Sequence, residues 1–467
     1  MCGICGIIDC SKKEVQKDLY ESLFHLQHRG QDSCGIHTSD SKKLFTVKGQ
    51  GLIRYVFTEP NLKKLQGFIG LGHVRYPTTG IITENEIQPF YLNRPHGISL
   101  VHNGNIYNSM EIREYLEDKN IHINSTSDSE LLLNLISYEL ELESYNSTDL
   151  TKNIETVVKK VSQMCKGAYS VILMIQDYGL VAFRDPYGIR PLVYGTKDDK
   201  VLVASESICH QSLEYDSVTN VKNGEIIIIE KNKPTIKKIR YDDSKPYTPC
   251  IFEYIYISRA ESVIDDVSVY LARIKMGKYL AHNIKKQMGD LLEEVDCVVP
   301  IPDTSRPSAI VVSKVLNIPY YEIIIKNRYV SRTFIMDSQK SRRLGVKRKL
   351  GIVDSLAKDK NILLIDDSIV RGNTIKHVIE TLKNYGVGKI YVASCSPPVR
   401  YSNVYGIDIP TRNELIANRI SVKEIKEFLG IDGLIYQTLS DLMKSIQEVN
   451  PDLKNFDMSV FNGVYIN

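Results

Sequence analysis

The stretch ILLIDDSIVRGNTI, residues 362–375, decides the fold of the second half of the chain. Its first four residues are apolar and predict a buried strand, two adjacent carboxylates follow, and a loop through Gly372 leads into an amphipathic helix. A fully apolar strand followed by such a helix is typical of a parallel sheet that is covered on both faces. Ligands of these sheets bind at the carboxyl ends of the strands, so this loop should carry a binding site.

The same pattern occurs on both sides of that stretch. VDCVVPI at 295–301 predicts a strand, PDTSRPSAIVVSKVL at 302–316 predicts a loop and a helix, and YYEIII at 320–325 predicts a further strand. Beyond the central helix, KIYVAS at 389–394 predicts the next strand. We therefore predict an α/β domain with a mostly parallel sheet over residues 250–467.

The first half of the chain consists of many short apolar segments separated by turn residues, such as KLFTVKG at 43–49 and ISLVHNG at 98–104. This pattern predicts a layered α+β domain over residues 1–240. The polar, turn-rich segment 237–248 is the predicted linker. A chain of 467 residues suits two such domains, because one domain usually takes roughly 100 to 200 residues.

Three helices are predicted within the first half, over residues 16–28, 110–119 and 128–141. The third begins after Ser127, which is a good N-cap residue, and has Glu130 in its first turn. These two residues have the spacing of a capping box, so we expect each side chain to bind the other's backbone amide.

Composition excludes several classes of function. Lys plus Arg number 59 and Asp plus Glu number 56, so no basic field exists to recruit nucleic acid or an anionic membrane surface. No apolar run is long enough to span a bilayer and no signal peptide is recognisable, so we expect a cytoplasmic protein. The nine cysteines are scattered and odd in number, which predicts reduced, mostly buried thiols.

Cys2 is a candidate nucleophile because it directly follows the initiator Met. A thiol attacks as thiolate and needs a base. Removal of Met1 would leave an α-amine whose unperturbed pKa, about 7.7 to 8.0, suits a general base acting on the adjacent side chain. The alternative is that Cys2 is a small hydrophobic residue at the start of a strand.

Six segments in order resemble the class II glutamine amidotransferases, which are N-terminal nucleophile hydrolases with layered αββα architecture. They are CGICGIID at 2–9, LQHRGQDSCGI at 26–36, GHVRYPTTG at 72–80, HNGNI at 102–106, SDSE at 127–130 and FRDPYGIRPL at 183–192. The resemblance makes Cys2 the nucleophile and implies that Arg75 binds the α-carboxylate of glutamine and Asp128 its α-ammonium group. Asn103 and the amide of Gly104 would form the oxyanion hole.

Each of these residues also has a structural interpretation. Arg75 could form a surface ion pair, Asn103 and Gly104 a hairpin turn, and Asp128 part of a helix cap. We expect residues 78–86 to close over glutamine.

Two histidines lie beside these residues in the sequence. His73 and His102 flank Arg75 and Asn103, and we expect both to be structural.

The loop at 366–374 suits a phosphorylated ribose. Asp366 and Asp367 can accept hydrogen bonds from the ribose 2- and 3-hydroxyls, directly or through a divalent ion. Backbone amides and the Thr374 hydroxyl can bind the 5-phosphate at a helix N-terminus. The alternative is an Asp-rich turn in which Thr374 caps the helix.

This loop resembles the phosphoribosyl-pyrophosphate motif of type I phosphoribosyltransferases. Four more segments match the amidophosphoribosyltransferase family: CIFEYIYISRAES at 250–262, SVYLAR at 268–273, VVPIPDTSRPSA at 298–309 and KNRYVSRTFIM at 326–336. The resemblance spans nearly the whole chain. It implies transfer of glutamine-derived ammonia to carbon 1 of phosphoribosyl pyrophosphate, giving phosphoribosylamine, glutamate and pyrophosphate, which is the committed step of purine synthesis.

The family resemblance also implies ligand roles. Ser305, Asp366 and Asp367 match its Mg²⁺ positions, and Lys326 with Arg328 would lie in a loop that folds over the pyrophosphate, although a KNR stretch is usually a solvated turn. The residues matched to phosphoribosyl pyrophosphate are Asp366, Asp367, Ser368, Arg371, Gly372, Asn373, Thr374, Lys326 and Arg328. Purine nucleotides as feedback inhibitors and a homotetramer are further expectations from the family.

Two positions depart from the family pattern. The family commonly has RGTT where this chain has RGNT, so Asn373 could shift phosphate affinity. One branch of the family binds an iron-sulfur cluster through four cysteines, of which Cys250 and Cys395 would be two. Asp457 and Val460 stand at the other two places, so we predict no cluster.

Two other functions are consistent with parts of the sequence. The chain could be a class II amidotransferase that feeds another acceptor, against which the IDDSIVRGNT loop argues. It could also be a catalytically silent homologue that binds nucleotides as a regulator, against which the intact candidate site residues argue.

Overall fold

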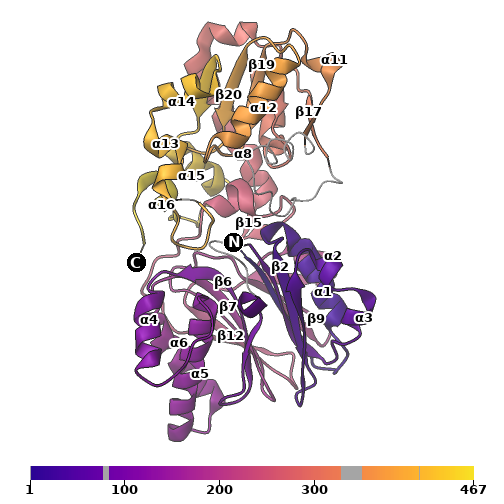
Figure 1. Cartoon of the computed structure of the whole chain (residues 1–467), viewed down its shortest axis with the longest axis vertical. Coiled ribbons are helices and arrows are strands. Elements are labelled where there is room, and N and C mark those ends of the chain that lie inside the picture. Colours follow the sequence, from indigo (N-terminus) through magenta and orange to yellow (C-terminus); the bar gives the residue numbers. More distant parts are fainter. Residues whose placement is uncertain (1, 77–83, 328–349, 410, 467) are drawn as a thin grey trace.

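The computed structural model describes residues 2–76, 84–327, 350–409 and 411–466. Two halves are stacked along the longest axis of the molecule, with two packed sheets in the first half and a smaller sheet in the second (Figure 1). The N-terminus lies near the junction of the halves. Within the described residues, no helix is long and apolar enough to cross a membrane.

The first half contains a seven-stranded sheet whose paired strands are antiparallel. Its strands, in spatial order, are β11 (Ser217–Asn220), β9 (Val193–Lys197), β10 (Lys200–Ala204), β1 (Cys2–Asp9), β4 (Ile69–Arg75), β2 (Ser33–Ser39) and β3 (Leu44–Gln50). Strand β1 is buried along nearly its whole length because it pairs with neighbours on both edges. Its register places Cys2 directly opposite Arg75.

A second antiparallel sheet packs against the first. Its six strands are β13 (Ile236–Arg240), β12 (Glu225–Glu230), β8 (Gly179–Arg184), β7 (Gly167–Ile175), β6 (Ile98–Ile106) and β5 (Phe90–Leu92). Apolar residues such as Ile4, Leu71 and Ile172 form a buried cluster between the two sheets. Strand β5 pairs only with residues 98–100, so no strand among the described residues lies on that edge at the far end of β6.

Helices cover the outer face of each sheet, which gives the four αββα layers that the sequence predicts. The first sheet is covered by α1 (Gln16–Leu26), α2 (Ile53–Val56) and α7 (Ile208–Ser212), with α3 (Glu59–Leu62) nearby. The second sheet is covered by α4 (Ser109–Glu117), α5 (Asp128–Asn146) and α6 (Leu150–Met164). The predicted fold of the first half is therefore confirmed.

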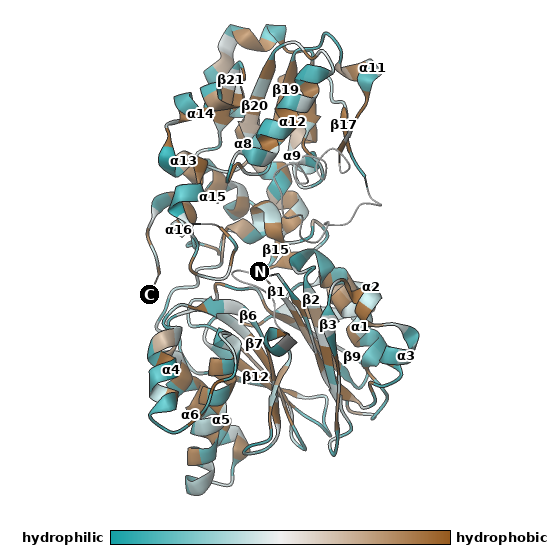
Figure 2. Ribbon diagram, in the orientation of Figure 1, coloured by the Kyte–Doolittle hydropathy of each residue, from teal (hydrophilic) through white to brown (hydrophobic). Residues whose placement is uncertain are grey.

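The second half has a four-stranded, fully parallel sheet, as predicted. Its strands, in spatial order, are β16 (Cys297–Pro300), β19 (Ile362–Asp366), β20 (Ile390–Ser394) and β21 (Gly433–Tyr436). Helices α8 (Val269–Met288) and α9 (Arg306–Leu316) cover one face, and α12 (Asn373–Asn384) and α14 (Val422–Leu429) cover the other. Figure 2 shows hydrophobic colour on β20 and hydrophilic colour on the outer side of α14.

The remaining elements of the second half are short, and the longest of them is α15 (Leu439–Gln447). The others are a π-helix (Glu253–Ile257), two 3₁₀ helices (Gly289–Glu294 and Arg412–Glu414), β14 (Val263–Ile264), β15 (Val267–Ser268), β17 (Ile324–Lys326), β18 (Leu350–Ile352), α11 (Asp354–Ala357), α13 (Ile416–Arg419) and α16 (Ser459–Asn462). Of the predicted strand 320–325, only the end is a strand, because it pairs with β18 outside the main sheet.

Two local predictions are wrong. Ser127 does cap α5, but its oxygen accepts from the amide of Ser129, and the Glu130 carboxylate binds the amides of Asn124 and Ser125, so no capping box forms. Residues 237–240 of the predicted linker belong to β13, because strand β12 offers an edge against which Ile236 and Ile239 pack.

The two halves share a buried interface. Ala168 and Ile189 of the first half lie in one apolar cluster with second-half residues that include Cys250 and Tyr405. A buried charge network also crosses it, and it consists of Arg29, Arg190 and Glu206 from the first half and Glu253 from the second. Arg29 binds Glu206, and its NH2 donates to Glu253 Oε2 at 2.5 Å.

Candidate functional site

Cys2 and Asn103 meet at the start of β1. The main-chain nitrogen of Cys2 donates to Oδ1 of Asn103 at 3.3 Å, and Cys2 itself is half-buried. Asn103 is fully buried, and its Nδ2 has no hydrogen-bond partner among the described residues. A buried amide donor that lacks an acceptor is costly unless a ligand completes it. Asn103 can therefore bind an oxygen that carries charge beside the Cys2 thiol.

Gly104 lies in the middle of a row of amides on the unpaired edge of β6. The amide of His102 donates to Oε1 of Gln88 at 2.7 Å, and the amide of Ile106 donates to Oδ2 of Asp128 at 3.0 Å. Alternate residues of a strand direct their amides to the same edge. The Gly104 amide therefore points to this edge too, next to the Asn103 side chain.

The predicted hairpin turn at Asn103 and Gly104 is thus excluded, because both residues lie within strand β6. Their register partners on β7 are Ser170 and Tyr169. A strand position fixes the direction of the Gly104 amide more firmly than a turn would.

Arg75 forms an ion pair with Glu86 near Cys2. Its NH1 and NH2 atoms each lie 3.2 Å from Oε2 of Glu86, and NH1 also donates to the Glu86 carbonyl at 3.0 Å. Glu86 is held in turn by the Thr126 hydroxyl at 2.6 Å. Glu86 therefore holds the guanidinium by its NH1 and NH2 edge. Residues 78–83 of the predicted closing segment 78–86 lie outside the described residues. Glu84–Glu86 form one 3₁₀ turn.

Asp128 is fixed by hydrogen bonds on the same edge of β6. Besides the Ile106 amide, it accepts from the Ser129 hydroxyl at 3.3 Å. Ser129 Oγ accepts from Nε2 of Gln88 at 2.9 Å and lies 3.0 Å from Nδ1 of His102. Asp128 is the first residue of α5, but its carboxylate points to β6, so it is more than a helix cap.

Both histidines of this region are buried. Burial lowers the pKa of His102 and lowers that of His73 well below its usual value, with the charge of Arg75 adding to the effect at His73. Both rings are therefore neutral at neutral pH, which fits the predicted structural role.

The second candidate site lies at the carboxyl end of β19, as predicted. Burial and mutual repulsion raise the pKa of Asp366 well above its usual value, and burial raises that of Asp367. Ser368 Oγ donates to Oδ1 of Asp367 at 2.6 Å. Two adjacent carboxyls with raised pKa values attract protons, cations or hydroxyl donors.

The loop from β16 lies beside these carboxyls. The amide of Ile301 donates to the carbonyl of Ile365, and the Ser305 hydroxyl donates to the carbonyl of Ile301 at 2.5 Å. Ser305 is buried, and both lone pairs of its oxygen remain able to bind a cation. The structure thus brings Ser305 to the same sheet edge as Asp366 and Asp367.

Helix α12 begins without a side-chain cap. Gly372 is its N-cap with φ of +79°, so the alternative that Thr374 caps the helix is excluded. Asn373 and Thr374 are exposed in the first turn, where helix amides and the helix dipole favour an anion. Arg371 pairs with Glu414 at 3.0 Å.

Lys326 is paired and lies at the end of β17. Its Nζ lies 2.7 Å from Oδ2 of Asp303, whose Oδ1 lies 2.6 Å from NH1 of Arg306. Opposite charges lower the pKa of Asp303, although burial acts against them. Arg328 lies outside the described residues, so its predicted role is not addressed by the structure.

Four residues that interact with the predicted site residues were not themselves predicted from the sequence. Glu86 and Gln88 support Arg75 and Asp128. Arg273 and Thr304 favour the charged form of Asp367, the first through its positive charge and the second through a hydrogen bond. Arg273 and Thr304 lie in two segments already matched to the family, SVYLAR and VVPIPDTSRPSA. Those matches were the sequence signal from which the two residues could have been predicted.

Cys250 and Cys395 lie in different apolar clusters of the second half. Burial raises the pKa of each thiol to about 12. Residue Asp457 is buried, pairs with Cys250 along the backbone and accepts from the Ser459 amide at 3.0 Å, and burial raises its pKa.

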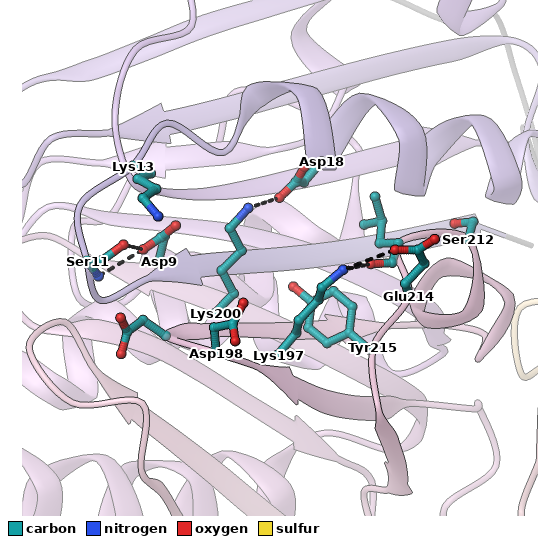
Figure 3. Close-up of a pocket in the computed structure, with 12 residues that line it drawn as sticks. Asp9, Ser11, Lys13, Asp18, Lys197, Asp198, Lys200, Ser212, Glu214 and Tyr215 are labelled. Atoms are coloured by element: carbon teal, nitrogen blue, oxygen red, sulfur yellow. Dashed lines mark hydrogen bonds and ion pairs between the residues drawn. The ribbon is translucent and has the colours of Figure 1, made fainter.

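Two pockets are present away from the apolar cores. One of about 350 Å³ is lined by Arg371, Asn373, Glu414 and neighbours beside the α12 loop. Another of about 430 Å³ lies at the end of β1 opposite Cys2 (Figure 3). Two ion pairs line it, Lys200 with Asp18 at 2.6 Å and Lys197 with Glu214 at 3.6 Å, and we assign it no ligand.

Comparison with known proteins identifies the class. Residues 73–211 match the glutamine amidotransferase domain, and residues 267–419 match the phosphoribosyl transferase domain. The chain is similar to solved structures that span both, including glutamine phosphoribosylpyrophosphate amidotransferase from B. subtilis in complex with ADP and GMP. That match has a TM-score of 0.87 and 35% identity over 99% of this chain and 97% of the other. The molecule is thus a glutamine amidotransferase joined to a phosphoribosyltransferase.

Curated relatives narrow the class to one family. Amidophosphoribosyltransferase from Pasteurella multocida (strain Pm70) is 46% identical over 100% of this chain and 93% of its own length, and that from Escherichia coli K12 is 45% identical over 100% and 92%. The chain belongs to the amidophosphoribosyltransferase family. Its reaction transfers glutamine-derived ammonia to carbon 1 of phosphoribosyl pyrophosphate, the committed step of purine biosynthesis.

Proposed function

We propose that Cys2, once Met1 has been removed, is the nucleophile that attacks the carboxamide of glutamine. The nitrogen that donates to Asn103 would then be the free α-amine, and it would take the proton of the Cys2 thiol. The sulfur–carbon bond forms as the amide carbonyl becomes an oxyanion. The oxyanion then collapses, the carbon–nitrogen bond breaks, and the α-amine returns the proton to the leaving ammonia. Water hydrolyses the remaining glutamyl thioester to glutamate and restores the Cys2 thiol.

The observation that carries this proposal is the unpartnered, buried Nδ2 of Asn103 next to Cys2. That atom and the Gly104 amide are two neighbouring donors beside Cys2, which is what an oxyanion hole requires. Arg75 and Asp128 flank it and would bind the α-carboxylate and α-ammonium groups of glutamine. The Nε and NH2 edge of Arg75, opposite the edge held by Glu86, would take the α-carboxylate.

In the second site, Asp366 and Asp367 would accept from the ribose hydroxyls, and residues 371–374 would bind the 5-phosphate. Support comes from the uncapped α12 terminus and the raised pKa values of the two carboxyls. Ser368 would orient Asp367. Asn373 adds an exposed amide where the family commonly has a hydroxyl, and a change in phosphate affinity remains a prediction.

Mg²⁺ fits this site because two desolvated carboxyls and a buried hydroxyl at one sheet edge are hard oxygen ligands. Asp366, Asp367 and Ser305 would hold it, together with substrate oxygens. When bound, the ion neutralises charge that develops on the pyrophosphate leaving group. Lys326, and by family resemblance Arg328, would stabilise the same group, with Lys326 exchanging Asp303 for pyrophosphate.

The prediction that the chain carries no iron-sulfur cluster rests on Asp457 and Val460. Cys250 forms a backbone pair with Asp457, a carboxyl group that replaces one of the four thiolates.

Regulation by purine nucleotides is proposed from the relatives. One solved relative is described in complex with ADP and GMP, and another as the allosteric regulatory enzyme of purine biosynthesis. We propose that purine nucleotides also inhibit this protein. A homotetramer and a cytoplasmic location stay predictions.

The test of the first-site assignment combines mass and activity. We expect active protein to lack Met1 by intact-mass analysis and to form glutamate and pyrophosphate from glutamine, phosphoribosyl pyrophosphate and Mg²⁺. Active protein that retains Met1 would exclude Cys2 as an N-terminal nucleophile.

A further inference from the structure

The far end of β6 is open on one edge. Strand β7 pairs with residues 98–106 on the other edge, whereas β5 pairs only with Ile98, Ser99 and Leu100, so among the described residues no strand neighbours 103–106 on the edge that carries the Gly104 amide. Gln88 and Asp128 hold the amides before and after Gly104 on this edge. Further support for Gly104 on this edge comes from outside the sheet.

The second half of the chain provides that support through residues 403–406. The side-chain amide of Asn105 donates to the carbonyl of Val404 at 2.9 Å across the interface between the halves. Gly406 lies so close to Gly104 that a Cβ on it would sit 2.6 Å from the Gly104 oxygen and 2.7 Å from its carbonyl carbon. Gly406 also has φ of +95°, a conformation that favours glycine.

This short loop is itself held firmly. Oδ1 of Asn403 accepts from the amides of Tyr405 and Ile407 at 2.8 and 3.0 Å. Tyr405 is fully buried, and its hydroxyl donates to the carbonyl of Ile466 at 2.5 Å. It shares an apolar cluster with Ala168, which is the β7 register partner of Asn105. The loop is therefore a rigid surface against which β6 rests.

We propose that Asn105 and Gly406 are positioning residues for the glutamine half-reaction: the phosphoribosyltransferase half completes the oxyanion hole of the glutaminase half. This inference rests on the proposed role of Asn103 and Gly104. Because an oxyanion hole acts on the transition state, loss of the support should lower kcat for glutamine hydrolysis and leave the KM for glutamine unchanged. Ammonia-dependent synthesis, which bypasses Cys2, should be unaffected.

The test compares substitutions on both sides of this contact in the full-length protein. Asn105→Ala removes the bond to Val404 and should lower kcat for glutamine about 10-fold, since a small misplacement of a catalytic donor is costly. Gly406→Ala forces its methyl group against Gly104 and should lower kcat on the order of 10²-fold. The KM for glutamine should stay within about 2-fold of wild type in both.

Two further variants make the result decisive. Asn153→Ala loses the same kind of bond, from Nδ2 to the Ser147 carbonyl at 2.9 Å, far along the chain on α6, and should change neither activity. Asn103→Ala removes a proposed oxyanion donor and should lower kcat by about 10² to 10³.

The other possible outcomes contradict the positioning role, the proposed oxyanion hole, or both. If Asn103→Ala lowers kcat but Asn105→Ala and Gly406→Ala do not, the positioning role is wrong and the proposed oxyanion hole stands. If Asn103→Ala has normal kcat, both fall. A rise in KM for glutamine, or an equal loss of ammonia-dependent activity, would also overturn the positioning role.

Discussion

The two candidate sites differ in how far the chain itself satisfies their charged groups. In the first site Arg75 is paired with Glu86, and Asp128 accepts from the Ile106 amide and Ser129. In the second site Asp366 and Asp367 stand side by side with raised pKa values, and the N-terminus of α12 has no side-chain cap. The proposed glutamine site is thus preorganised within the chain, whereas the proposed phosphoribosyl site would be completed by its ligands.

This difference follows from what each site binds. Glutamine carries one carboxylate and one ammonium group. One positive and one negative side chain, Arg75 and Asp128, held in place before glutamine binds, therefore suit it. Phosphoribosyl pyrophosphate brings several negative charges and a cation, so a site with open donors and unneutralised carboxyls suits it.

The largest expected effect separates the two sites completely. Cys2→Ala should abolish glutamine-dependent synthesis, because it removes the proposed nucleophile, and should leave ammonia-dependent synthesis within about 2-fold of wild type. Both activities are measured as pyrophosphate release. Cys10→Ala, which changes another half-buried thiol at the far end of β1, is the control and should retain both. Loss of both activities in Cys2→Ala would point to a structural role.

The second effect tests the dependence of the phosphoribosyl site on a cation. Asp367→Asn removes a charge that would bind Mg²⁺ or the ribose, and should lower synthesis from either nitrogen donor by about 10². Removal of divalent cations with a chelator should do the same to the wild type, and added Mg²⁺ should restore it. The assay is pyrophosphate release from phosphoribosyl pyrophosphate with glutamine or ammonia as nitrogen donor.

A matched control for Asp367→Asn is Asp354→Asn, in the first turn of α11, which should behave as wild type. Chelator-resistant activity would contradict the assignment of a metal to this site.

A smaller effect probes the preorganisation of the glutamine site. Gln88→Ala removes the donor to Ser129, which in turn supports Asp128, so the KM for glutamine should rise about 10-fold with a smaller change in kcat. Steady-state kinetics with glutamine measure both. Gln447→Ala, which loses a bond to the Leu453 carbonyl, is the control. An unchanged KM would show that Asp128 needs no support from Gln88.

The smallest effect concerns stability away from both sites. Burial raises the pKa of Asp457, so its contribution to stability is full below its unfolded pKa and is lost as pH rises through the folded pKa. Asp457→Asn should therefore remove part of the pH dependence of unfolding above about pH 4, and at neutral pH it should change the free energy of unfolding by no more than about 1 kcal/mol. Thermal unfolding measured as the pH is raised from that value tests it. A large loss confined to high pH would indicate that the Asp457 carboxylate is needed in its charged form.

Local patterns in the sequence predicted the fold well. The apolar run ILLI followed by two carboxylates and a glycine gave β19, the loop and α12 in the right order, because strand, turn and helix signals are local. The resemblance of the motifs to a known family predicted that Cys2, Asn103, Arg75 and Asp128 lie in one site.

The contacts that hold those residues were not predictable from one sequence. Glu130 has the spacing of a capping box, yet the Asn124 and Ser125 amides compete for its carboxylate. The sequence predicts that Lys326 is solvated, but Asp303, 23 residues earlier, pairs with it. The contact of Gly406 with Gly104 joins positions about three hundred residues apart. Such partners depend on tertiary packing, and no local spacing encodes them.

The buried charge network at the junction of the halves has a consequence for how the protein unfolds. Arg29 and Glu206 belong to the first half and Glu253 to the second, and separating the halves would expose or strand these charges together with the apolar cluster around Ala168. The halves match two distinct domain families in sequence, but they should melt in a single cooperative transition. Each half would then depend on the other for its stability.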